Sequence, residues 1–320
     1  MRPLRPTLLA ICCVLLCMNT VGCSSSASRE TARTVATFRF VDVAGTRLRV
    51  RSIGSPKARQ TLVLVHGGPG LSLESLGNLD ALAGVDRRLV SYDQRGTGQS
   101  DQPTDGDYGP EAQLRDLDGV RVWAGAKRID LLGQSWGGLL AAAYTAKHPD
   151  VVRSLVLLDA APLDWAAFLD GQQRFSTRER ALRVQGVVPA VLPPDDGDSC
   201  LPSLLARIPV YLANERDPVP AFATTCRAST SRATFAAFQS PSAQEELTRL
   251  AVALGAYRGR ALVIMGRNDP FGLGWLERSV ELLGGAQIEQ LVVERSGHLS
   301  SLERPEVVLP EMNTWLTAGG

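Results

Sequence analysis

The chain has 320 residues, of which 44% are hydrophobic and 21% are charged, and a globular chain of this length buries roughly three quarters of its unfolded surface. This composition excludes a disordered chain and a collagen-like repeat. Lys and Arg number 34 against 33 Asp and Glu, a formal net charge of +1 at pH 7, so no net field draws the chain to nucleic acid or to an anionic membrane.

The first residues have the pattern of a secretory signal. Two arginines within residues 1–6 precede a mostly apolar run at 7–18, which is too short to span a bilayer as a helix. The run ends in Thr20-Val21-Gly22-Cys23, which resembles the cleavage box of bacterial lipoproteins except at Thr20, where Leu is usual. The resemblance implies an exported protein of the bacterial cell envelope, held to a membrane by a lipid on Cys23; plain signal cleavage, giving a periplasmic protein, is the alternative.

We expect residues 1–22 to be a signal peptide and residues 23–36, rich in Ser, Thr and Ala, to be a tether. Strands are predicted at 37–43 and 47–53, joined as a hairpin around Ala44-Gly45, and then at 61–65 and 89–92. Helices at 111–124 and 137–147 then alternate with strands at 129–132 and 154–158. This order predicts a mostly parallel sheet with helices on both faces.

The alternation stops over residues 162–259 and resumes with a strand at 261–265, a helix at 273–283, a strand at 288–293 and a helix at 306–316. The interruption contains Pro193-Pro194 and the acidic run 195–198, and it has too many breakers for a continuous core of its own. We therefore expect a lid at 162–259, inserted into a core made of 37–161 and 260–320.

The lid holds the two cysteines that follow Cys23 in the chain, Cys200 and Cys226. An even number of cysteines in an exported protein suits a disulfide. Such a bridge is worth about 3 kcal/mol if its geometry is unstrained. Two unrelated buried thiols are the alternative.

A turn between a strand and a helix carries the first candidate for chemistry. The strand at 129–132 leads into Gly133-Gln134-Ser135-Trp136-Gly137-Gly138, and an alanine-rich helix follows. This G-x-S-x-G pattern predicts a tight turn with a strained serine and small residues on either side. The Ser135 hydroxyl would then face outward at the carboxyl end of the sheet, which makes it the candidate nucleophile; an idle serine in a glycine-rich turn is the alternative.

A second glycine-rich loop, His66-Gly67-Gly68-Pro69-Gly70, directly follows the strand at 61–65. Acyl transfer needs two N–H donors beside the developing oxyanion, each worth about 3 to 4 kcal/mol of barrier. We assign these donors to the N–H groups of Gly68 and Trp136, because Pro69 has no N–H.

The chain has three histidines that could serve as the base. His66 is fixed in the glycine-rich loop, and His148 is separated from Ser135 by a helix of roughly 15 Å. His298 follows the last strand and lies at the same sheet edge as Ser135. Elimination therefore makes His298 the predicted general base.

The imidazole needs a carboxylate to fix its tautomer. Asp269, in Gly266-Arg267-Asn268-Asp269-Pro270, follows the strand at 261–265 at this edge. The order Ser135, Asp269, His298 is that of an α/β-hydrolase. Asp159 is the rival acid, because it follows the preceding strand at the same edge.

Three motifs together resemble the α/β-hydrolases, and within them the proline iminopeptidase group of serine aminopeptidases. They are the two glycine-rich stretches above and Tyr92-Asp93-Gln94-Arg95-Gly96-Thr97-Gly98-Gln99-Ser100. The segment 116–118 with Arg121 also looks like the helix before the nucleophile strand in that group. The resemblance covers about residues 60–160 and 260–316. It implies the α/β-hydrolase fold with an inserted helical lid, a triad that uses no metal or cofactor, and structural roles for Asp93 and Arg95.

The same resemblance implies release of N-terminal residues from small peptides. Members of the group hold the substrate's free amine with acidic residues of the lid, and the candidates here are Glu215, Asp217, Glu245 and Glu246. The alternative for each is a solvated surface charge, and Gln134 replaces the glycine that is usual before the serine. The leading hypothesis is therefore a proline iminopeptidase-like aminopeptidase acting on small molecules or short peptides, without nucleic acid as a partner. The alternatives are an esterase or lactonase on small acyl substrates, and a non-catalytic envelope binding protein with this fold.

Overall fold

The computed structural model describes residues 35–43, 45–218 and 223–319. The expected signal peptide, Cys23 and nearly all of the expected tether lie outside the described residues. Within the described ranges, no helix is both long and apolar enough to cross a membrane.

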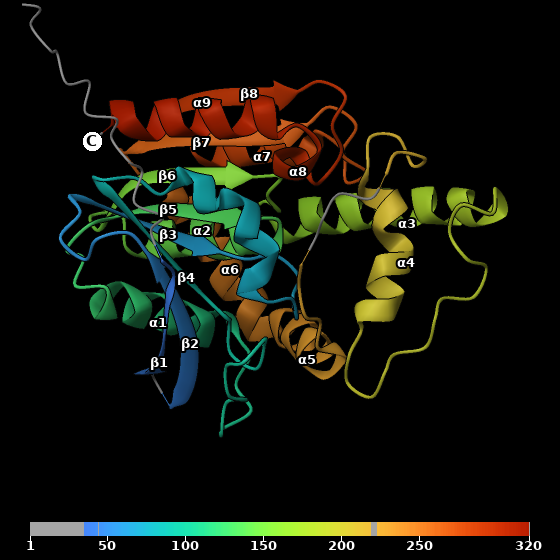
Figure 1. The fold of residues 1–320 in the computed structure, drawn as a ribbon, viewed down its shortest axis with the longest axis horizontal. Helices are drawn as coiled ribbons and strands as arrows, with labels where there is room; N and C mark the ends of the chain where they lie inside the picture. Colours follow the sequence, from blue (N-terminus) through green and yellow to red (C-terminus); the bar gives the residue numbers. More distant parts are fainter. Residues whose placement is uncertain (1–34, 44, 219–222, 320) are drawn as a thin grey trace, which may run out of the picture. The chain divides into compact units, whose positions relative to one another are not determined.

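Among the described residues, eight strands form one sheet in the order β1-β2-β4-β3-β5-β6-β7-β8 (Figure 1). Their bounds are β1 (Thr37–Val43), β2 (Thr46–Ile53), β3 (Gln60–Val65), β4 (Arg87–Tyr92), β5 (Ile129–Gln134), β6 (Val152–Leu158), β7 (Arg260–Gly266) and β8 (Gln287–Val293). Strands β1, β2 and β4 pair antiparallel, whereas every pair from β4 through β8 is parallel. The predicted α/β class with a mostly parallel sheet is therefore confirmed.

Helices cover both faces of the sheet. The core helices are the 3-10 helix η1 (Leu73–Leu82), α1 (Pro110–Trp123), α2 (Trp136–Lys147), α7 (Gly274–Leu282), α8 (Ser300–Glu303) and α9 (Pro305–Ala318). Because successive strand residues point to opposite faces, Val63 and Val65 of β3 join the apolar cluster with α1, α2 and α7, whereas Leu62 and Leu64 join the cluster with η1 and α9.

The segment between β6 and β7, called the insert here (residues 162–259), contains α3 (Trp165–Val184), α4 (Leu201–Tyr211), α5 (Ala228–Phe238) and α6 (Pro241–Leu254). Helices α3 and α4 lie beyond the carboxyl ends of the parallel strands (Figure 1). Helix α6 instead packs against α1 and α2, in the helical layer beside the sheet. The insert therefore has a part that faces the strand ends and a part that extends the core.

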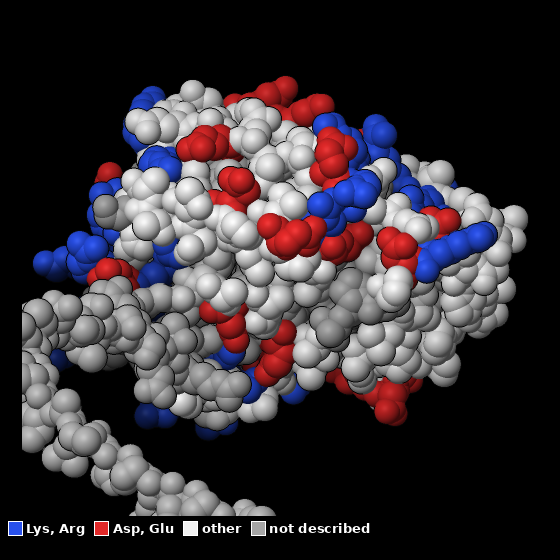
Figure 2. Space-filling view, turned by 45° about the horizontal axis from the view of Figure 1, so that its top comes forward, with Lys and Arg blue, Asp and Glu red and all other residues white. Residues whose placement is uncertain are grey.

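Charged side chains are distributed over the surface. On the face shown in Figure 2, basic and acidic groups are interspersed. Many charged groups of the described residues form ion pairs, such as Arg278 with Asp164 and Glu281. This mixed pattern agrees with the nearly balanced charge of the sequence.

Candidate active site

Ser135 sits in a sharp turn between β5 and α2, with φ 55° and ψ −123°. The turn needs glycine on both sides, because a Cβ on Gly133 would overlap the Gly137 carbonyl and one on Gly137 would overlap the Val65 carbonyl. The Ser135 N–H donates to the Leu158 carbonyl at 3.1 Å, and the Ser135 carbonyl accepts from Gly138 N at 2.8 Å. The predicted tight turn is thus present, and the main chain of the neighbouring strand supports it.

Three side chains from three loops form one hydrogen-bonded row. His298 Nε2 lies 2.9 Å from Ser135 Oγ, and His298 Nδ1 lies 2.7 Å from Asp269 Oδ2. Both members of the His298–Asp269 pair are buried. With the Nδ1 proton donated to Asp269, Nε2 is free to accept the proton of the Ser135 hydroxyl.

The electrostatic surroundings favour a proton on His298. Burial lowers the pKa of the imidazole, but the charge and hydrogen bond of Asp269, together with the charges of Asp159 and Glu303, oppose burial, and the pKa is raised above its ordinary value of 6.5. Asp269 is itself oriented, because its Oδ1 accepts the Phe271 N–H at 2.9 Å. A carboxylate in this position stabilises the imidazolium that proton transfer produces.

Asp159, the rival acid, is engaged elsewhere. It has a positive φ of 46°, and its Oδ1 accepts the Gly266 N–H at 3.2 Å while its Oδ2 accepts the N–H and the hydroxyl of Ser300 at 3.0 and 2.7 Å. Burial raises the pKa of Asp159 to about 8. The Asp159 side chain therefore joins the end of β7 to the start of α8, and it is Asp269 that contacts His298.

The loop that carries His298 is held by the insert. The His298 N–H donates to the Tyr211 carbonyl at 2.7 Å, and a Cβ on Gly297 would overlap that same carbonyl. Glu303 accepts the N–H groups of Gly297 and Ala213, each at 2.8 Å. Sequence reasoning did not single out Tyr211 or Glu303, because their roles depend on contacts between distant parts of the chain.

The two N–H groups assigned to an oxyanion hole are available. Neither Gly68 N nor Trp136 N has a hydrogen-bond partner among the described residues. Trp136 is the first residue of α2, where the helix leaves its N–H unpaired. Gly67 lies against Ser135, since a Cβ there would come 3.1 Å from the Ser135 Cβ. The glycine-rich loop therefore lies directly beside the serine.

His66 has a structural position. Its Nε2 accepts the Gln94 N–H at 3.1 Å, so the ring is neutral and its Nδ1 donates to the Gly67 carbonyl at 2.8 Å. Burial lowers the pKa of His66 to about 4, which keeps the ring neutral at physiological pH. His148 caps the far end of α2 and packs against the Tyr144 ring at 4.7 Å.

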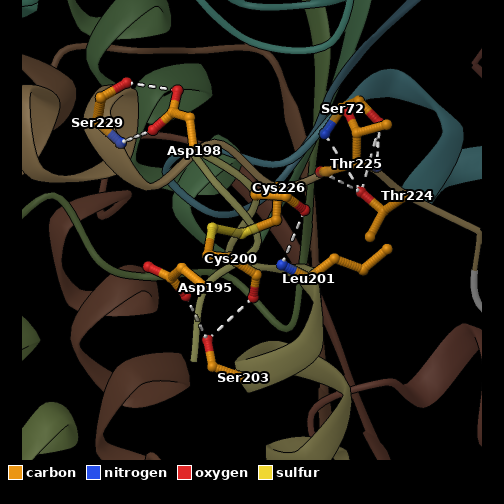
Figure 3. The surroundings of a disulfide bond; sticks show 11 residues. Ser72, Asp195, Asp198, Cys200, Leu201, Ser203, Thr224, Thr225, Cys226 and Ser229 are labelled. Carbon is orange, nitrogen blue, oxygen red and sulfur yellow. Dashed lines mark hydrogen bonds between the residues drawn. A yellow bond between two sulfur atoms is a disulfide. The ribbon is translucent and has the colours of Figure 1, made fainter. Parts of the chain in front are cut away.

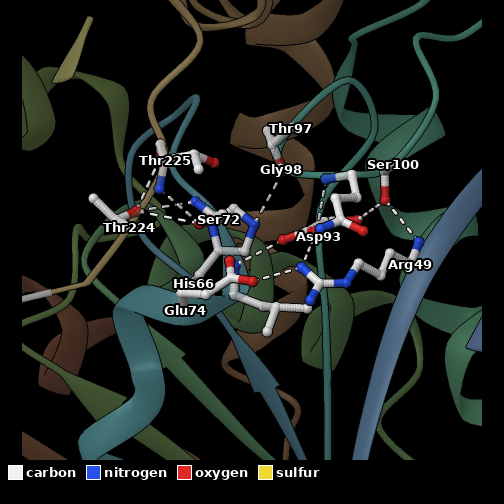
Figure 4. A network of polar contacts seen from close by, with 12 residues as sticks. Arg49, His66, Ser72, Glu74, Asp93, Thr97, Gly98, Ser100, Thr224 and Thr225 are labelled. Carbon is white, nitrogen blue, oxygen red and sulfur yellow. Dashed lines mark hydrogen bonds and ion pairs between the residues drawn. The ribbon is translucent and has the colours of Figure 1, made fainter. Parts of the chain in front are cut away.

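Asp93 and Arg95 are also placed as supports. Asp93 accepts the N–H groups of Leu73 and Gln99 at 2.8 and 2.9 Å, within a network that includes Arg49 (Figure 4). Arg95 donates two hydrogen bonds to Asp116, at 2.8 and 2.7 Å, and both side chains are fully buried. These contacts hold the loops around the site rather than reaching into it.

A pocket of about 230 Å³ opens on Ser135 and His298. Its remaining walls are the glycine-rich loop with Leu71 and Gln134, one face of α4, and parts of the insert around the cysteines. The lining residues are Gly67, Gly68, Pro69, Leu71, Gln134, Ser135, Cys200, Ser203, Leu204, Arg207, Ile208, Tyr211, Cys226, Ser231, His298 and Leu299. The α4 residues were not predicted, although their spacing of three and four positions marks a single helix face.

The acidic residues expected to bind a free amine lie outside this pocket. Glu215 turns toward Arg178, with 3.5 Å between the charged groups, and Asp217 accepts a hydrogen bond from Asn214 at 2.7 Å. Glu246 pairs with Arg249 on α6, and Glu245 is exposed on the same helix. None of the four lines this pocket, because α6 packs on the core and Glu215 pairs with an arginine of α3.

Cys200 and Cys226 form a disulfide (Figure 3). The Cys200 N–H also donates to the Cys226 carbonyl at 3.0 Å, and the next residue, Arg227, donates its N–H to the Gly70 carbonyl at 2.9 Å. Through these bonds the start of α4 is tied to the loop that carries Gly68. The bridge therefore forms one wall of the pocket as well as a crosslink within the insert.

Comparisons with known proteins show relatives that match part of this chain. The chain is 41% identical to a proline iminopeptidase of Lactobacillus helveticus over 111 residues, 33% of this chain and 38% of that protein. It is 33% identical to one of Heyndrickxia coagulans over 150 residues, 47% of this chain and 51% of that protein. The chain therefore matches between about two fifths and half of the length of these relatives.

Solved structures share the fold over nearly their whole length. A proline iminopeptidase of Mycobacterium smegmatis has a TM-score of 0.61 at 20% identity, covering 88% of this chain and 98% of that one. An esterase of Exiguobacterium antarcticum has a TM-score of 0.60 at 20% identity, covering 88% and 100%. The family model described as the alpha/beta hydrolase fold matches residues 60–305. This chain belongs to the α/β-hydrolase family.

Proposed function

We propose that this protein is a serine hydrolase that cleaves small acyl substrates through an acyl-enzyme on Ser135. The observation that carries the proposal is the pair of hydrogen bonds that joins Ser135, His298 and Asp269 at the mouth of one pocket. A hydroxyl, an imidazole and a carboxylate in this arrangement are the parts that nucleophilic acyl transfer requires.

Acylation follows from these contacts. Ser135 Oγ attacks the substrate carbonyl carbon while His298 Nε2 takes the hydroxyl proton, and Asp269 holds the imidazolium in position. The oxyanion that forms accepts hydrogen bonds from Gly68 N and Trp136 N. When the tetrahedral intermediate collapses, His298 returns the proton to the leaving alcohol or amine, and the acyl group stays on Ser135.

Deacylation reverses the roles with water in place of the leaving group. His298 Nε2 removes a proton from a water molecule, whose oxygen attacks the acyl carbon. Collapse of the second intermediate breaks the bond to Ser135 Oγ, which recovers its proton from His298. The net reaction consumes one water and releases an acid and an alcohol or amine.

Short acyl esters and lactones are the substrate class that the pocket supports best. Its volume of about 230 Å³ suits a small acyl group. Among the described residues that line it there is no Asp or Glu, so a protonated amine has no carboxylate partner in the pocket wall.

An aminopeptidase of the proline iminopeptidase kind is the second candidate. The relatives from Lactobacillus and Heyndrickxia bear that name and match part of this chain at 41% and 33% identity. Amide and ester hydrolysis share the same acyl-enzyme steps, so the two candidates differ in how the substrate is held.

A matched pair of fluorogenic substrates separates the candidates. The chain from Ser24 onward is assayed on a prolyl amide and on a short-chain acyl ester, with Ser135→Ala as the control. Turnover of the ester alone supports the first candidate. Turnover of the amide that disappears when its free amine is acylated establishes the second. Activity that survives in Ser135→Ala contradicts both.

We also propose that the enzyme is exported to the cell envelope and anchored by a lipid on Cys23. The support is the sequence of residues 1–23 and the Cys200–Cys226 disulfide, since disulfides persist in oxidising compartments. The full chain expressed in a bacterium should fractionate with membranes and incorporate labelled fatty acid, whereas Cys23→Ser should lose the label. Incorporation that is unchanged in Cys23→Ser would rule out this anchor.

A further inference from the structure

The pocket wall formed by α4 carries a cation that the reaction at Ser135 does not use. Five residues on one face of this helix line the pocket: Ser203, Leu204, Arg207, Ile208 and Tyr211. Among the described lining residues, Arg207 is the single Lys or Arg, and it faces a pocket without a carboxylate.

Arg207 shares its carboxylate partner with a second arginine. Its Nε and Nη2 donate to the two oxygens of Glu179 at 3.2 and 2.8 Å, and Arg183 donates to the same Glu179 at 2.5 Å. One carboxylate therefore faces two guanidinium groups, which leaves a net positive charge. Arg207 Nη1 has no hydrogen-bond partner within the described residues, and the side chain is 37% exposed. Two N–H donors are thus available to a molecule in the pocket.

The position of Arg207 is fixed with respect to the reacting groups. It lies one helical turn before Tyr211, whose ring centroid is 5.7 Å from that of His298. Its guanidinium stands 5.8 Å from the Phe175 ring, and Phe175 stacks on Phe271, which contacts His298 edge-on. The disulfide fixes the start of α4, and the bond from His298 N to the Tyr211 carbonyl fixes its end.

We propose that the pocket binds substrates that carry a carboxylate away from the scissile bond, and that Arg207 holds this carboxylate through Nη1. The inference rests on the proposed function, which supplies the acyl transfer at Ser135. A hydrogen bond between two charged groups is roughly twice as strong as a neutral one, whereas Arg207 repels an ammonium group in the same place. The substrate class is therefore half-esters of dicarboxylic acids, or acyl compounds whose leaving half ends in a carboxylate.

Two pairs of esters test the proposal. Monomethyl glutarate is compared with methyl valerate for a carboxylate on the acyl half, and O-butyrylglycolate with ethyl butyrate for one on the leaving half. In at least one of the two pairs, the substrate with the carboxylate should have a higher kcat/KM than its neutral partner. The ratio of carboxylate to neutral substrate should fall about tenfold or more in Arg207→Gln, because a charge-assisted hydrogen bond is lost. Arg207→Lys, which keeps the charge, should restore part of the ratio.

Arg183→Gln is the matched control, because it removes an arginine from the same Glu179 without touching the pocket lining. In Arg183→Gln, the ratio of kcat/KM for the carboxylate substrate to kcat/KM for the neutral one should equal that of the parent enzyme. Two results would show that Arg207 only joins α3 to α4 and would overturn the proposal. One is that kcat/KM falls by the same factor for the carboxylate and the neutral substrate in Arg207→Gln. The other is that the ratio of the two falls as much in Arg183→Gln as in Arg207→Gln.

Binding to the inactive variant separates failure of this proposal from failure of the proposed function. Glutarate and O-butyrylglycolate are titrated calorimetrically into Ser135→Ala, with and without Arg207→Gln. Arg207-dependent binding supports the carboxylate site even if no ester is turned over, a result that would refute only the esterase form of the proposed function. Turnover of the neutral esters without any carboxylate preference or binding would refute the site and leave the hydrolase function standing.

Discussion

At the scale of single residues, the roles of two buried aspartates follow from where their oxygens point. Asp269 faces His298 Nδ1, whereas Asp159 accepts hydrogen bonds from Gly266 and Ser300. Both carboxyls lie at the carboxyl edge of the sheet, one strand apart, so the sequence alone left the choice between them open. The direction of each side chain depends on loops that only the folded chain brings together.

Asp269→Asn should lower kcat about ten-thousandfold, because an amide at this position favours the wrong tautomer of the imidazole. Asp159→Asn keeps an oxygen that can accept the Gly266 N–H, so it should lower kcat far less than Asp269→Asn does. Steady-state kinetics of both variants on one ester measure the difference. Retained activity in Asp269→Asn together with loss in Asp159→Asn would move the acid to the rival position.

The pH profile reports on His298. Only the neutral imidazole can take the proton of Ser135, so kcat/KM should rise with pH through the pKa of His298. Burial lowers that pKa, but Asp269 raises it with help from the charges of Asp159 and Glu303, and the midpoint should lie above 6.5. In Asp269→Asn the carboxylate that raises the His298 pKa is gone, while burial still lowers it. The midpoint of the residual activity should therefore move to lower pH. A midpoint at or below 6.5 in the unmodified enzyme would contradict this electrostatic account.

At the scale of elements, the insert forms part of the site. Helix α4 supplies one wall of the pocket, its last residue accepts the His298 N–H, and the segment around Cys226 bonds to the glycine-rich loop and to Ser72 just after it. Thr225 N donates to Ser72 Oγ at 2.9 Å, and Arg227 N donates to the Gly70 carbonyl at 2.9 Å. The two ends of the pocket are therefore held by contacts between the insert and the core.

Loss of the disulfide should loosen this arrangement. A Cys200→Ser, Cys226→Ser double variant should unfold with a free energy about 3 kcal/mol lower than the parent, since the bridge closes a loop with a sequence separation of 26. Urea unfolding of both proteins, with and without reductant, measures this difference. Reductant should destabilise the parent and leave the variant unchanged. Equal stability of parent and variant would mean that the bridge does not constrain the unfolded chain.

The elements that the sequence predicted best are those with strong local patterns. The strand at 129–134, the turn at Ser135 and the helix at 136–147 follow from apolar runs and glycine spacing, and the parallel order follows from their alternation. The helices of the insert were harder to predict from the sequence. Their apolar faces are completed by partners distant in sequence, such as Phe175 on Phe271, and breakers such as Pro193-Pro194 hide the pattern.

At the scale of the whole molecule, the fold brings the carboxyl ends of β3, β5, β7 and β8 together, and each contributes a loop to the site. The glycine-rich loop follows β3, Ser135 follows β5, Asp269 follows β7 and His298 follows β8. Chain order and the expected parallel sheet, whose strands end at one edge, were enough to predict that these residues would meet. The charge of the pocket was not predictable in this way, because it depends on which acidic side chains form ion pairs with arginines elsewhere.

The labelling of Ser135 by a fluorophosphonate tests the central claim most directly. The chain from Ser24 onward is treated with the probe and digested, and the modified peptide is identified by mass spectrometry. The account predicts one adduct, on Ser135, and no labelling of Ser135→Ala, whose circular dichroism should match that of the parent. Persistent labelling of Ser135→Ala, or an adduct on another residue, would contradict the assignment of Ser135 as the nucleophile.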